Sequence, residues 1–380
     1  MGPAPGGESF LELLAGLPDP RVERTRRHSL VSVLFLCLCG VVCGANDPVA
    51  IECFGVARRP FLEKFVEFPG GIPSHDTIGR VLAKLDPTAL EALFARWMRG
   101  VAEATNHDVI AIDGKVLRRA FSQAAGGTFI TMVSAWSTAN GVVVGQVANE
   151  EGSNEITAIP RLLDLLHLKG CLVTIDAAGC QTNIAAKIVD AEGDYLLAVR
   201  DNQPRLYKAV VKQFETLRDS AVPHAREHYA TTTEMNRGRQ ETRACWVLPI
   251  TDEFSEAARW QNLANIIVYE SERTVDGAVS RGIRMFITSK KSLTAKQALA
   301  SVRGHWQIEN TLHWTLDVAF REDDSRLRAD NAAENFAVVR HVALNLLRGV
   351  KGSNVGIRNR RLKAAWSDDF LTKVLASHGD

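Results

Sequence analysis

The chain has 380 residues and a formal net charge of +1 at pH 7, with 46% hydrophobic and 23% charged residues. The composition is ordinary for a globular protein with a buried core, and the length predicts two or three domains. The near-zero charge excludes a uniformly basic nucleic-acid-binding surface, so any contact with DNA must come from local patches.

Two basic stretches qualify as such patches. They contain Arg21, Arg24, Arg26 and Arg27 near the start, and Arg348, Lys351, Arg358, Arg360, Arg361 and Lys363 near the end. Either stretch could track DNA phosphates. The alternative is a solvated face for the first and a loose tail for the second.

Cysteine usage and one apolar run bear on the compartment. There are seven cysteines, an odd number, and no C-x-x-C pair, so we expect buried reduced thiols rather than disulfides or a zinc site. The apolar run at residues 30–45 is shorter than the roughly 20 residues of a membrane span. We therefore predict a buried helix, no membrane partner and a cytoplasmic protein.

The first part of the chain reads as an all-helical domain, residues 1–105, which could contact DNA. Ser74 and Asp76 follow Pro73 as helix-start residues, and Asp86-Pro87 marks a break. The predicted helices cover residues 10–17, 30–44, 48–66, 75–85 and 88–105.

From residue 106 the pattern changes to alternating strands and helices. Asn140-Gly141 is a hairpin turn signal between two β-rich runs. The predicted elements are strands 109–113, 129–137, 141–147, 171–176 and 195–199, with helices 155–166 and 181–191. This β-β-β-α-β-α-β order predicts an α/β fold with a ribonuclease-H-like mixed sheet, whose first part is residues 106–203.

The rest of the chain divides into three segments. Residues 204–292 are expected to be a β-rich insertion, with strands at 237–248, 264–272 and 283–289. Residues 293–350 would supply the carboxy-terminal helices of the core, beginning with a capping box at Thr294 and Gln297 and running to Phe320. A second helix is predicted at 331–350, followed by a basic tail at 351–380.

Two aspartates stand at the predicted carboxyl ends of apolar strands. Asp113 follows Val-Ile-Ala-Ile and Asp176 follows Leu-Val-Thr-Ile. Ligands gather at the carboxyl ends of strands in α/β sheets, and small neighbours such as Gly114 leave room for a metal. The alternative for each residue is a turn or helix-cap aspartate.

A third acid lies in the late helix. His305, Glu309 and His313 are four residues apart and share one helix face. The alternatives are a structural polar cluster, or a zinc site made by the two histidines, although the H-E-x-x-H pattern is absent.

Three carboxylates suit Mg²⁺ or Mn²⁺, which prefer oxygen ligands. Two such ions about 3.5–4 Å apart can stabilise the attacking and leaving oxygens in phosphodiester displacement. The sequence has no G-x-x-x-x-G-K-[ST] loop, so ATP dependence is not expected.

The motifs around these acids resemble those of insertion-sequence transposases of the H-repeat-associated (ISAs-type) group, in the DDE superfamily. The resemblance covers about residues 20–347. It is carried by Asp19-Pro-Arg21, Gly71-Ile-Pro-Ser-His-Asp-Thr77, Ala111-Ile-Asp-Gly-Lys115, Thr174-Ile-Asp-Ala-Ala-Gly-Cys-Gln181, Arg237-Gly-Arg-Gln-Glu-Thr-Arg243 and Arg303-Gly-His-Trp-Gln-Ile-Glu-Asn310.

The resemblance implies a DNA transposase with Asp113, Asp176 and Glu309 as catalytic metal ligands. Such an enzyme binds the terminal inverted repeats of its element, exposes a 3′-hydroxyl by metal-dependent cleavage and transfers that strand into target DNA. The resemblance also implies a homodimer in the DNA complex and association with the bacterial nucleoid.

The chain departs from broader relatives, which carry Tyr, Arg, Glu and Lys around the third acid. Val302, His305, Glu309 and Leu316 stand there, so only the acid is retained. Asp317 and Asp323 are rivals for third ligand. The residues predicted to contact DNA are Lys115, Arg239, Arg243, Arg303, His305 and His313, although Lys115 could be a surface lysine and the arginines could pair with acids.

Two other functions remain open from the sequence. The missing Tyr, Arg and Lys partners are consistent with an inactive, domesticated DNA-binding protein. A stand-alone nuclease of similar fold would also need the three acids.

Overall fold

The computed structural model describes residues 10–102, 108–121, 129–149, 153–218, 228–236 and 238–377. The chain forms two compact units. Unit 1 comprises residues 1–105, 114–166 and 309–380, and unit 2 comprises residues 106–113 and 167–308. Strand β1 (Val109–Phe121) contributes to both, because it continues through the boundary after Asp113.

Unit 1 begins with the predicted helices. The starts of α2, α3 and α4 are fixed by Ser29, Asp47 and Ser74, whose side chains accept hydrogen bonds from backbone N–H groups. The helices are α1 (Phe10–Ala15), α2 (Leu30–Val42), α3 (Pro48–Leu62), α4 (His75–Lys84) and α5 (Pro87–Ala102), with a short 3-10 turn η1 (Glu23–Thr25).

The apolar run predicted as a buried helix is α2, and that prediction is confirmed. Nearly all of its residues are buried. Within the described part of the chain, no helix is both long and apolar enough to span a membrane. Six of the seven cysteines are buried free thiols, and Cys53 is exposed.

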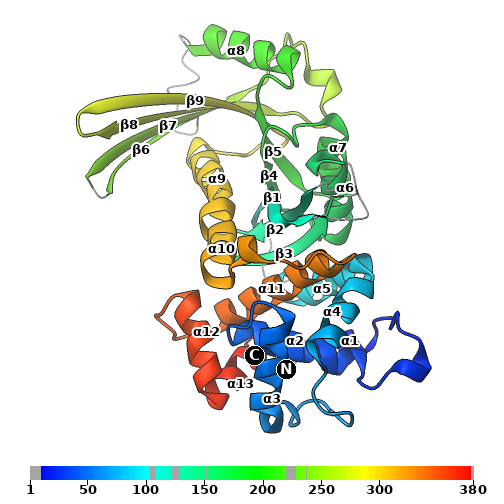
Figure 1. Ribbon diagram of the computed structural model, residues 1–380. Coiled ribbons are helices and arrows are strands. Elements are labelled where there is room, and N and C mark those ends of the chain that lie inside the picture. Colours follow the sequence, from blue (N-terminus) through cyan, green and yellow to red (C-terminus); the bar gives the residue numbers. More distant parts are fainter. Residues whose placement is uncertain are drawn as a thin grey trace. The chain divides into compact units, whose positions relative to one another are not determined.

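The late helices complete unit 1. Helix α11 (Ala332–Gly349) is buried over most of its length and packs against α2, α4, α5 and β3, as Figure 1 shows. The segment predicted as a basic tail contains two further helices, α12 (Ile357–Trp366) and α13 (Asp368–Ala376), which also pack on α11.

The predicted hairpin of unit 1 is present. β2 (Phe129–Ser137) and β3 (Val142–Ala148) pair antiparallel, and Gly141 has the positive φ of 64° that its turn requires. Helix α6 (Glu155–Leu165) packs on this hairpin. At Gly145, a Cβ would come within 2.8 Å of Leu166, so the glycine permits the close approach.

Unit 2 carries the parallel strands of the core. β4 (Leu172–Ile175) pairs with both β1 and β5 (Asp194–Val199) in parallel, and α7 (Thr182–Asp190) connects β4 to β5. The strand order along the sheet is β3-β2-β1-β4-β5-β9-β8-β7-β6. The predicted fold class, a mixed α/β sheet of ribonuclease-H-like order preceded by helices, is confirmed.

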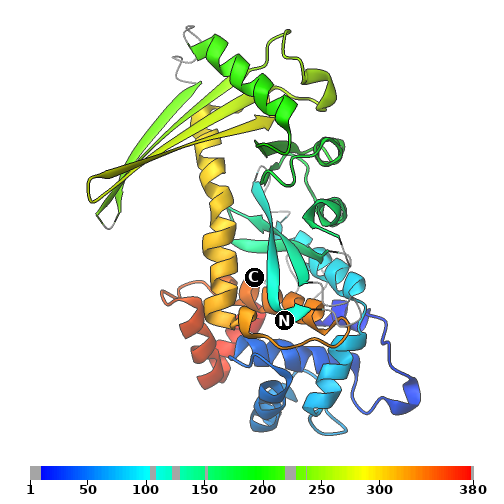
Figure 2. The same cartoon turned by 45° about the horizontal axis from the view of Figure 1, so that its top comes forward.

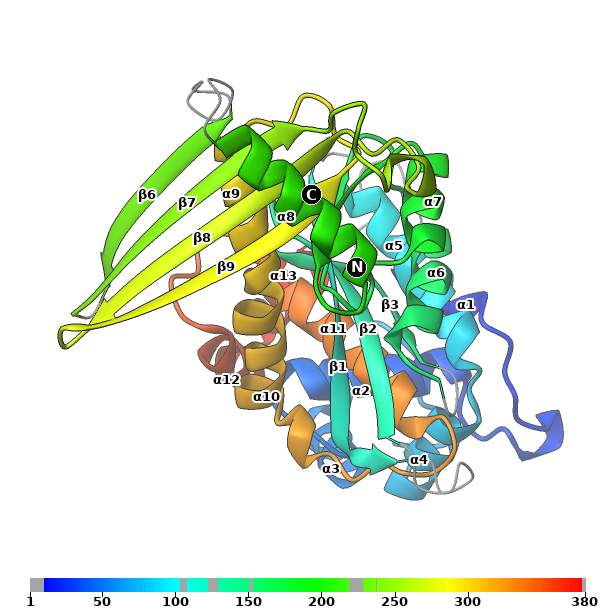
Figure 3. The ribbon, with the colours of Figure 1, turned by 90° about the horizontal axis from the view of Figure 1, so that it is seen from above.

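The insertion extends the core sheet. β9 pairs antiparallel with β5, and the four insertion strands follow one another as hairpins (Figure 3). These strands are β6 (Tyr229–Asn236), β7 (Arg239–Pro249), β8 (Asn265–Val275) and β9 (Ala278–Thr288). A short 3-10 turn, η3 (Ala257–Arg259), precedes β8.

Two helices cover opposite faces of the insertion sheet. On one face, Phe214 of α8 (Pro204–Arg218) packs edge-on against Trp246, with ring centroids 5.7 Å apart. On the other face, Leu299 and Val302 of α9 (Ala295–Gln307) join Cys245 in a buried cluster. Figure 2 shows α8 lying across these strands.

Several sequence predictions need correction. Helix α8 and strand β6 were not predicted, and β1 continues eight residues beyond Asp113, to Phe121. The helix predicted from Thr294 to Phe320 has the expected capping box, but a π-helical segment, η4 (Ile308–His313), separates α9 from α10 (Trp314–Phe320). Thr105 and Arg237, predicted ends of a helix and a strand, lie outside the described residues.

Candidate active site

The register of two parallel strands brings Asp113 and Asp176 to neighbouring positions in unit 2. β1 and β4 pair in parallel up to the partners Ile112 and Ile175. Asp113 and Asp176 directly follow these two partners in the chain, and adjacent strands lie about 4.8 Å apart. Both side chains are half-buried. The two predicted acids therefore follow paired residues of neighbouring strands.

The two aspartates are positioned by different local structures. β4 ends at Ile175, and the Asp176 Oδ1 accepts a hydrogen bond of 3.2 Å from the Gly179 N–H, which fixes the turn after the strand. Asp113, by contrast, lies inside β1. The prediction that its strand ends there was wrong, although parallel pairing with β4 does stop at the preceding residue.

His305 lies against the strand that carries Asp176. Its Nδ1 is 3.1 Å from the hydroxyl of Thr174, two residues before the aspartate. Burial lowers the pKa of His305, and the nearby Asp176 carboxylate only partly offsets that effect. His305 is therefore a neutral imidazole beside Asp176, in contact with β4.

Arg284 is a candidate that sequence reasoning missed. Its guanidinium lies over the ring of Trp306, 4.4 Å from the centroid, and 5.9 Å from that of Tyr269, its cross-strand partner. The charge of Arg284 also contributes to the low pKa of His305. Its strand was predicted, but only the register with β8 and the packing of α9 place this arginine near the histidine.

Glu309 lies in the π-helical segment η4 and is exposed. A π segment frees backbone carbonyls, and such segments occur frequently at functional sites. The Thr311 carbonyl accepts from Arg348 Nη2 at 3.1 Å and from the Thr315 hydroxyl. These two donors bind the backbone of the π segment from its own next turn and from α11.

Lys115 is held within unit 1 by three carboxylates. Its Nζ lies 2.6 Å from Asp317 Oδ1, 2.9 Å from Glu322 Oε2 and 3.2 Å from Asp323 Oδ1. Asp317 belongs to α10, and the other two acids belong to the 3-10 turn η5 (Glu322–Asp324). The predicted phosphate contact and two rival metal ligands thus bind one another.

Comparison with protein families identifies the family of the chain. Residues 11–98 match the family of segments associated with the DDE transposase, and residues 104–346 match the transposase DDE domain. The chain belongs to the DDE transposase family.

Two relatives that match over nearly their whole length are also named as transposases. The transposase is 41% identical to the Escherichia coli protein named "Putative transposase YncI" over 97% of its own length and 95% of the relative's. It is 38% identical to the Escherichia coli "H repeat-associated putative transposase YhhI", over 98% and 99% of the two chains. The predicted group is therefore confirmed.

Among solved structures, the transposase is similar to the piggyBac transposase synaptic complex with hairpin DNA. The TM-score is 0.42 at 9% sequence identity, covering 97% of this chain and 75% of the other. A likeness at that level does not define residue roles.

Two arginines predicted to contact DNA bind the same acid. Arg303 makes a double contact with Glu234, at 2.7 and 3.0 Å, and Arg243 reaches the same carboxylate at 3.1 Å. Arg303 in particular lowers the pKa of Glu234. The alternative of pairing with acids thus describes both arginines, whereas Arg239 is exposed at the start of β7.

The two histidines on the predicted helix face have separate surroundings. His305 belongs to unit 2, whereas His313 belongs to unit 1. Burial first, and then the charge of Lys115, lowers the pKa of His313 to about 4. In the ranges that the structure covers, no group of three or more His, Cys, Asp or Glu side chains is set to hold a metal ion.

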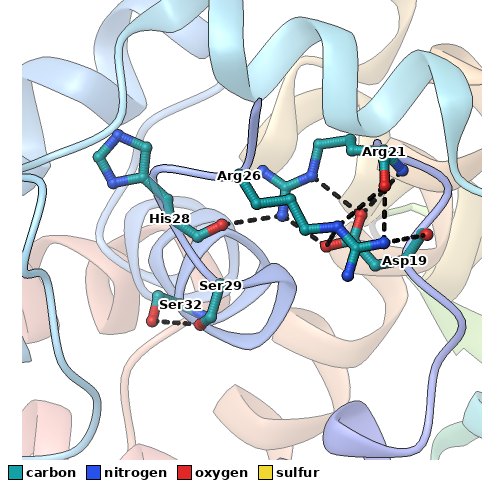
Figure 4. Close-up of polar contacts among 6 residues, drawn as sticks. All are labelled: Asp19, Arg21, Arg26, His28, Ser29 and Ser32. Carbon is teal, nitrogen blue, oxygen red and sulfur yellow. Dashed lines mark hydrogen bonds and ion pairs between the residues drawn. The ribbon is translucent and has the colours of Figure 1, made fainter. Parts of the chain in front are cut away.

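Two of the four arginines in the basic stretch near the start form hydrogen bonds and ion pairs with neighbouring residues. Arg21 binds both oxygens of Asp19 and also donates to the His28 carbonyl at 2.9 Å, as Figure 4 shows. Arg26 donates to the Arg21 carbonyl at 2.6 Å and lies 3.5 Å from Asp19. Arg24 and Arg27 are exposed.

The second basic stretch supplies internal donors. Arg361 is buried and donates to the carbonyls of Val41 and Ala319. Arg348 donates to Gly141 as well as to Thr311, and Arg360 donates to the carbonyl of Leu347. These three guanidiniums bind backbone carbonyls of unit 1, and the alternative of a loose tail does not describe the segment, which contains α12 and α13.

Proposed function

We propose that this chain is an active DNA transposase that uses divalent cations to cleave phosphodiester bonds at the ends of its element and to join them to target DNA. The observation that carries this proposal is the register of β1 and β4, which pairs Ile112 with Ile175, the residues directly before Asp113 and Asp176. Family membership supplies the reaction class.

Glu309 is the proposed third ligand, and the course of its helix supports it. Leu299 and Val302 share a buried cluster with Leu172, at the start of β4, whereas His305 reaches Thr174 near its end. The helix therefore advances in the same direction as the strand. Glu309 follows His305 by about one turn, roughly 6 Å of rise.

The donor chemistry of these acids fits Mg²⁺ or Mn²⁺. Carboxylate oxygens are the ligands that both ions prefer, and Asp113 and Asp176 directly follow the paired residues Ile112 and Ile175. When two ions are bound, they supply Lewis-acid stabilisation of the attacking and leaving oxygens. His305, neutral and hydrogen-bonded to Thr174, borders the carboxylate of Asp176 without adding a charge.

The DNA partners are proposed to be the terminal inverted repeats of the element and the target DNA. Arg239 is exposed on the insertion, and the half-buried Arg284, stacked on Trp306, presents a cation near His305. A guanidinium binds phosphate oxygens well because its donors form a planar fork. Joining two ends calls for a homodimer in the DNA complex, acting on the nucleoid in the cytoplasm.

The test compares Asp113→Asn, Asp176→Asn and Glu309→Gln with wild type on DNA carrying the element's ends, in Mg²⁺ and in Mn²⁺. Asp252→Asn, an exposed turn residue, is the matched control. We expect each of the three variants to lower the cleavage rate at least a hundredfold while DNA binding is kept, and the control to cleave like wild type.

Other outcomes assign other functions. Cleavage by Asp113→Asn at the wild-type rate would remove the assigned site. Wild-type protein that binds the ends but never nicks them would be an inactive DNA-binding protein. Hydrolysis of unrelated DNA, without preference for the ends and without joining, would identify a nuclease.

A further inference from the structure

We propose that Lys115 is a positioning residue for the metal ligands, whose cluster of ion pairs within unit 1 joins the strand segment that follows Asp113 to the helical segment that follows Glu309. This inference rests on the proposed function. It assigns to Lys115 a role different from the DNA contact predicted from sequence.

Lys115 and its partner Asp317 each lie a short distance along the chain from a proposed metal ligand. It follows Asp113 by two residues in β1, and alternate residues of a strand point to the same face. Its partner Asp317 follows Glu309 by eight residues, about two helical turns, across the π segment and into α10. One ammonium group thus connects the segments that follow two of the three proposed ligands.

The surroundings of Lys115 make the connection rigid. The side chain of Lys115 is 11% exposed, that of Glu322 is 2% exposed, and Glu322 also lies 3.6 Å from the buried Arg340. Burial opposes the charge of Lys115, but Glu322 and Asp317 outweigh it and raise the pKa of the lysine. A buried ion pair that is satisfied on several sides has few alternative geometries.

The same helical segment is anchored at two further points. Arg348 donates to the Thr311 carbonyl inside the π segment, and Arg361 donates to the Ala319 carbonyl near the end of α10. Lys115 is the anchor between these two that comes from β1. Removing it would leave Asp317, Glu322 and Asp323 without their common cation and release α10 from the strand.

A phosphate-binding lysine would behave differently. Such a residue keeps its ammonium accessible, and its loss weakens DNA binding and reduces the salt dependence of binding by about one counterion. A positioning residue acts on the metal site, because residues that orient metal ligands typically change metal affinity about 10–100-fold when mutated. Metal affinity and DNA affinity therefore separate the two roles.

The experiment uses the full chain with DNA ends and titrates Mn²⁺, following free Mn²⁺ by electron paramagnetic resonance, so it does not depend on catalysis. The variants are Lys115→Met, Lys115→Arg and Asp317→Asn. Arg118→Met is the matched control, since Arg118 is 77% exposed on the same strand and also contacts Asp323.

We expect Lys115→Met to weaken Mn²⁺ binding at least tenfold, with an unchanged Kd for DNA and an unchanged salt slope. Raising the Mn²⁺ concentration should restore cleavage by Lys115→Met but not by Asp113→Asn. Lys115→Arg should recover most of the affinity, and Arg118→Met should match wild type. If Lys115→Met does not fold, Asp317→Asn takes its place, because the Asp317 side chain is 32% exposed and its replacement is milder. Asp317→Asn should then weaken Mn²⁺ binding about threefold or more.

Wild-type Mn²⁺ affinity in a folded Lys115→Met, or in Asp317→Asn where the methionine variant does not fold, would overturn the inference. So would a salt slope reduced by about one with Mn²⁺ binding intact, which would make Lys115 a DNA contact. Failure of the proposed function gives a different result from failure of this inference. In that case Asp113→Asn would bind Mn²⁺ as tightly as wild type and would cleave DNA at the wild-type rate.

Discussion

Replacing Glu322 by Gln should destabilise the protein strongly, because this buried carboxylate serves two buried cations. Its oxygens lie 2.9 Å from Lys115 and 3.6 Å from Arg340. At an effective dielectric constant of about 20, the two attractions total roughly 10 kcal/mol before costs are subtracted. Desolvation of the carboxylate removes several kcal/mol, and a glutamine keeps one hydrogen bond. We expect a net loss of about 3 kcal/mol in the free energy of unfolding at pH 7.

The pH dependence of this loss follows from the pKa of Glu322. Burial alone would raise it, but Lys115 and Arg340 hold it below its ordinary value of 4.5. Stability from a carboxylate with a lowered pKa is present above the unfolded-state pKa and is lost as the pH falls through the folded-state pKa. The difference between Glu322→Gln and wild type should therefore shrink below about pH 4.5.

Urea unfolding at several pH values measures this difference. Asp324→Asn is the control, because Asp324 is 47% exposed and pairs with exposed arginines at 2.9 and 3.6 Å. Pairs of that kind contribute about 0–1 kcal/mol. A loss below about 1 kcal/mol for Glu322→Gln at pH 7, or one that stays constant down to pH 3, would refute the reasoning.

Three further predictions concern the core of unit 1. Asn345→Leu should cost about 2–4 kcal/mol in urea unfolding, because Asn345 bonds both the N–H and the carbonyl of Val143, at 3.0 and 2.7 Å, and both would be left unsatisfied; an unchanged midpoint would contradict this. Gly145→Ala should cost about 1–3 kcal/mol by forcing Leu166 away, which calorimetry can check against Gly79→Ala, a position with open space. Burial lowers the pKa of His341 to about 4, so stability should fall as the pH drops from about 6.5 to 4, when the unfolded chain takes up the proton first; His341→Leu should flatten that slope, and an equal slope in both proteins would count against it.

Local patterns predicted most elements because their causes are local. The hairpin at Gly141, the capping box at Thr294 and the buried helix α2 depend on neighbouring residues, and all are present. Strand β6 was missed because it is rich in threonine and lacks an apolar face, so its pairing with β7 decides its structure. Helix α8 did carry a signal, since Leu206 and Val210 are four residues apart and buried.

The candidate site was predictable only in part. The apolar runs before Asp113 and Asp176 predicted two strands, and these strands do pair in parallel up to the residues before the aspartates. Their role as metal ligands stays a prediction. The partners of Lys115 lie 202 to 208 residues away, so no spacing in the sequence reveals them. The same applies to Arg303 and Glu234, which meet only through the packing of α9 on the insertion sheet. Glu309 as a metal ligand stays a prediction.

The packing of α2 has a consequence for synthesis on the ribosome. This apolar helix is covered by α11, which follows it by roughly 290 residues, and translation at about 5–20 residues per second leaves it uncovered for roughly 15–60 s. A nascent chain that has not yet reached α11 exposes the apolar surface of α2, the kind of surface that chaperones bind. Copies shortened by a premature stop codon before α11 would keep that surface permanently, and cells should clear them by proteolysis rather than accumulate a soluble fragment.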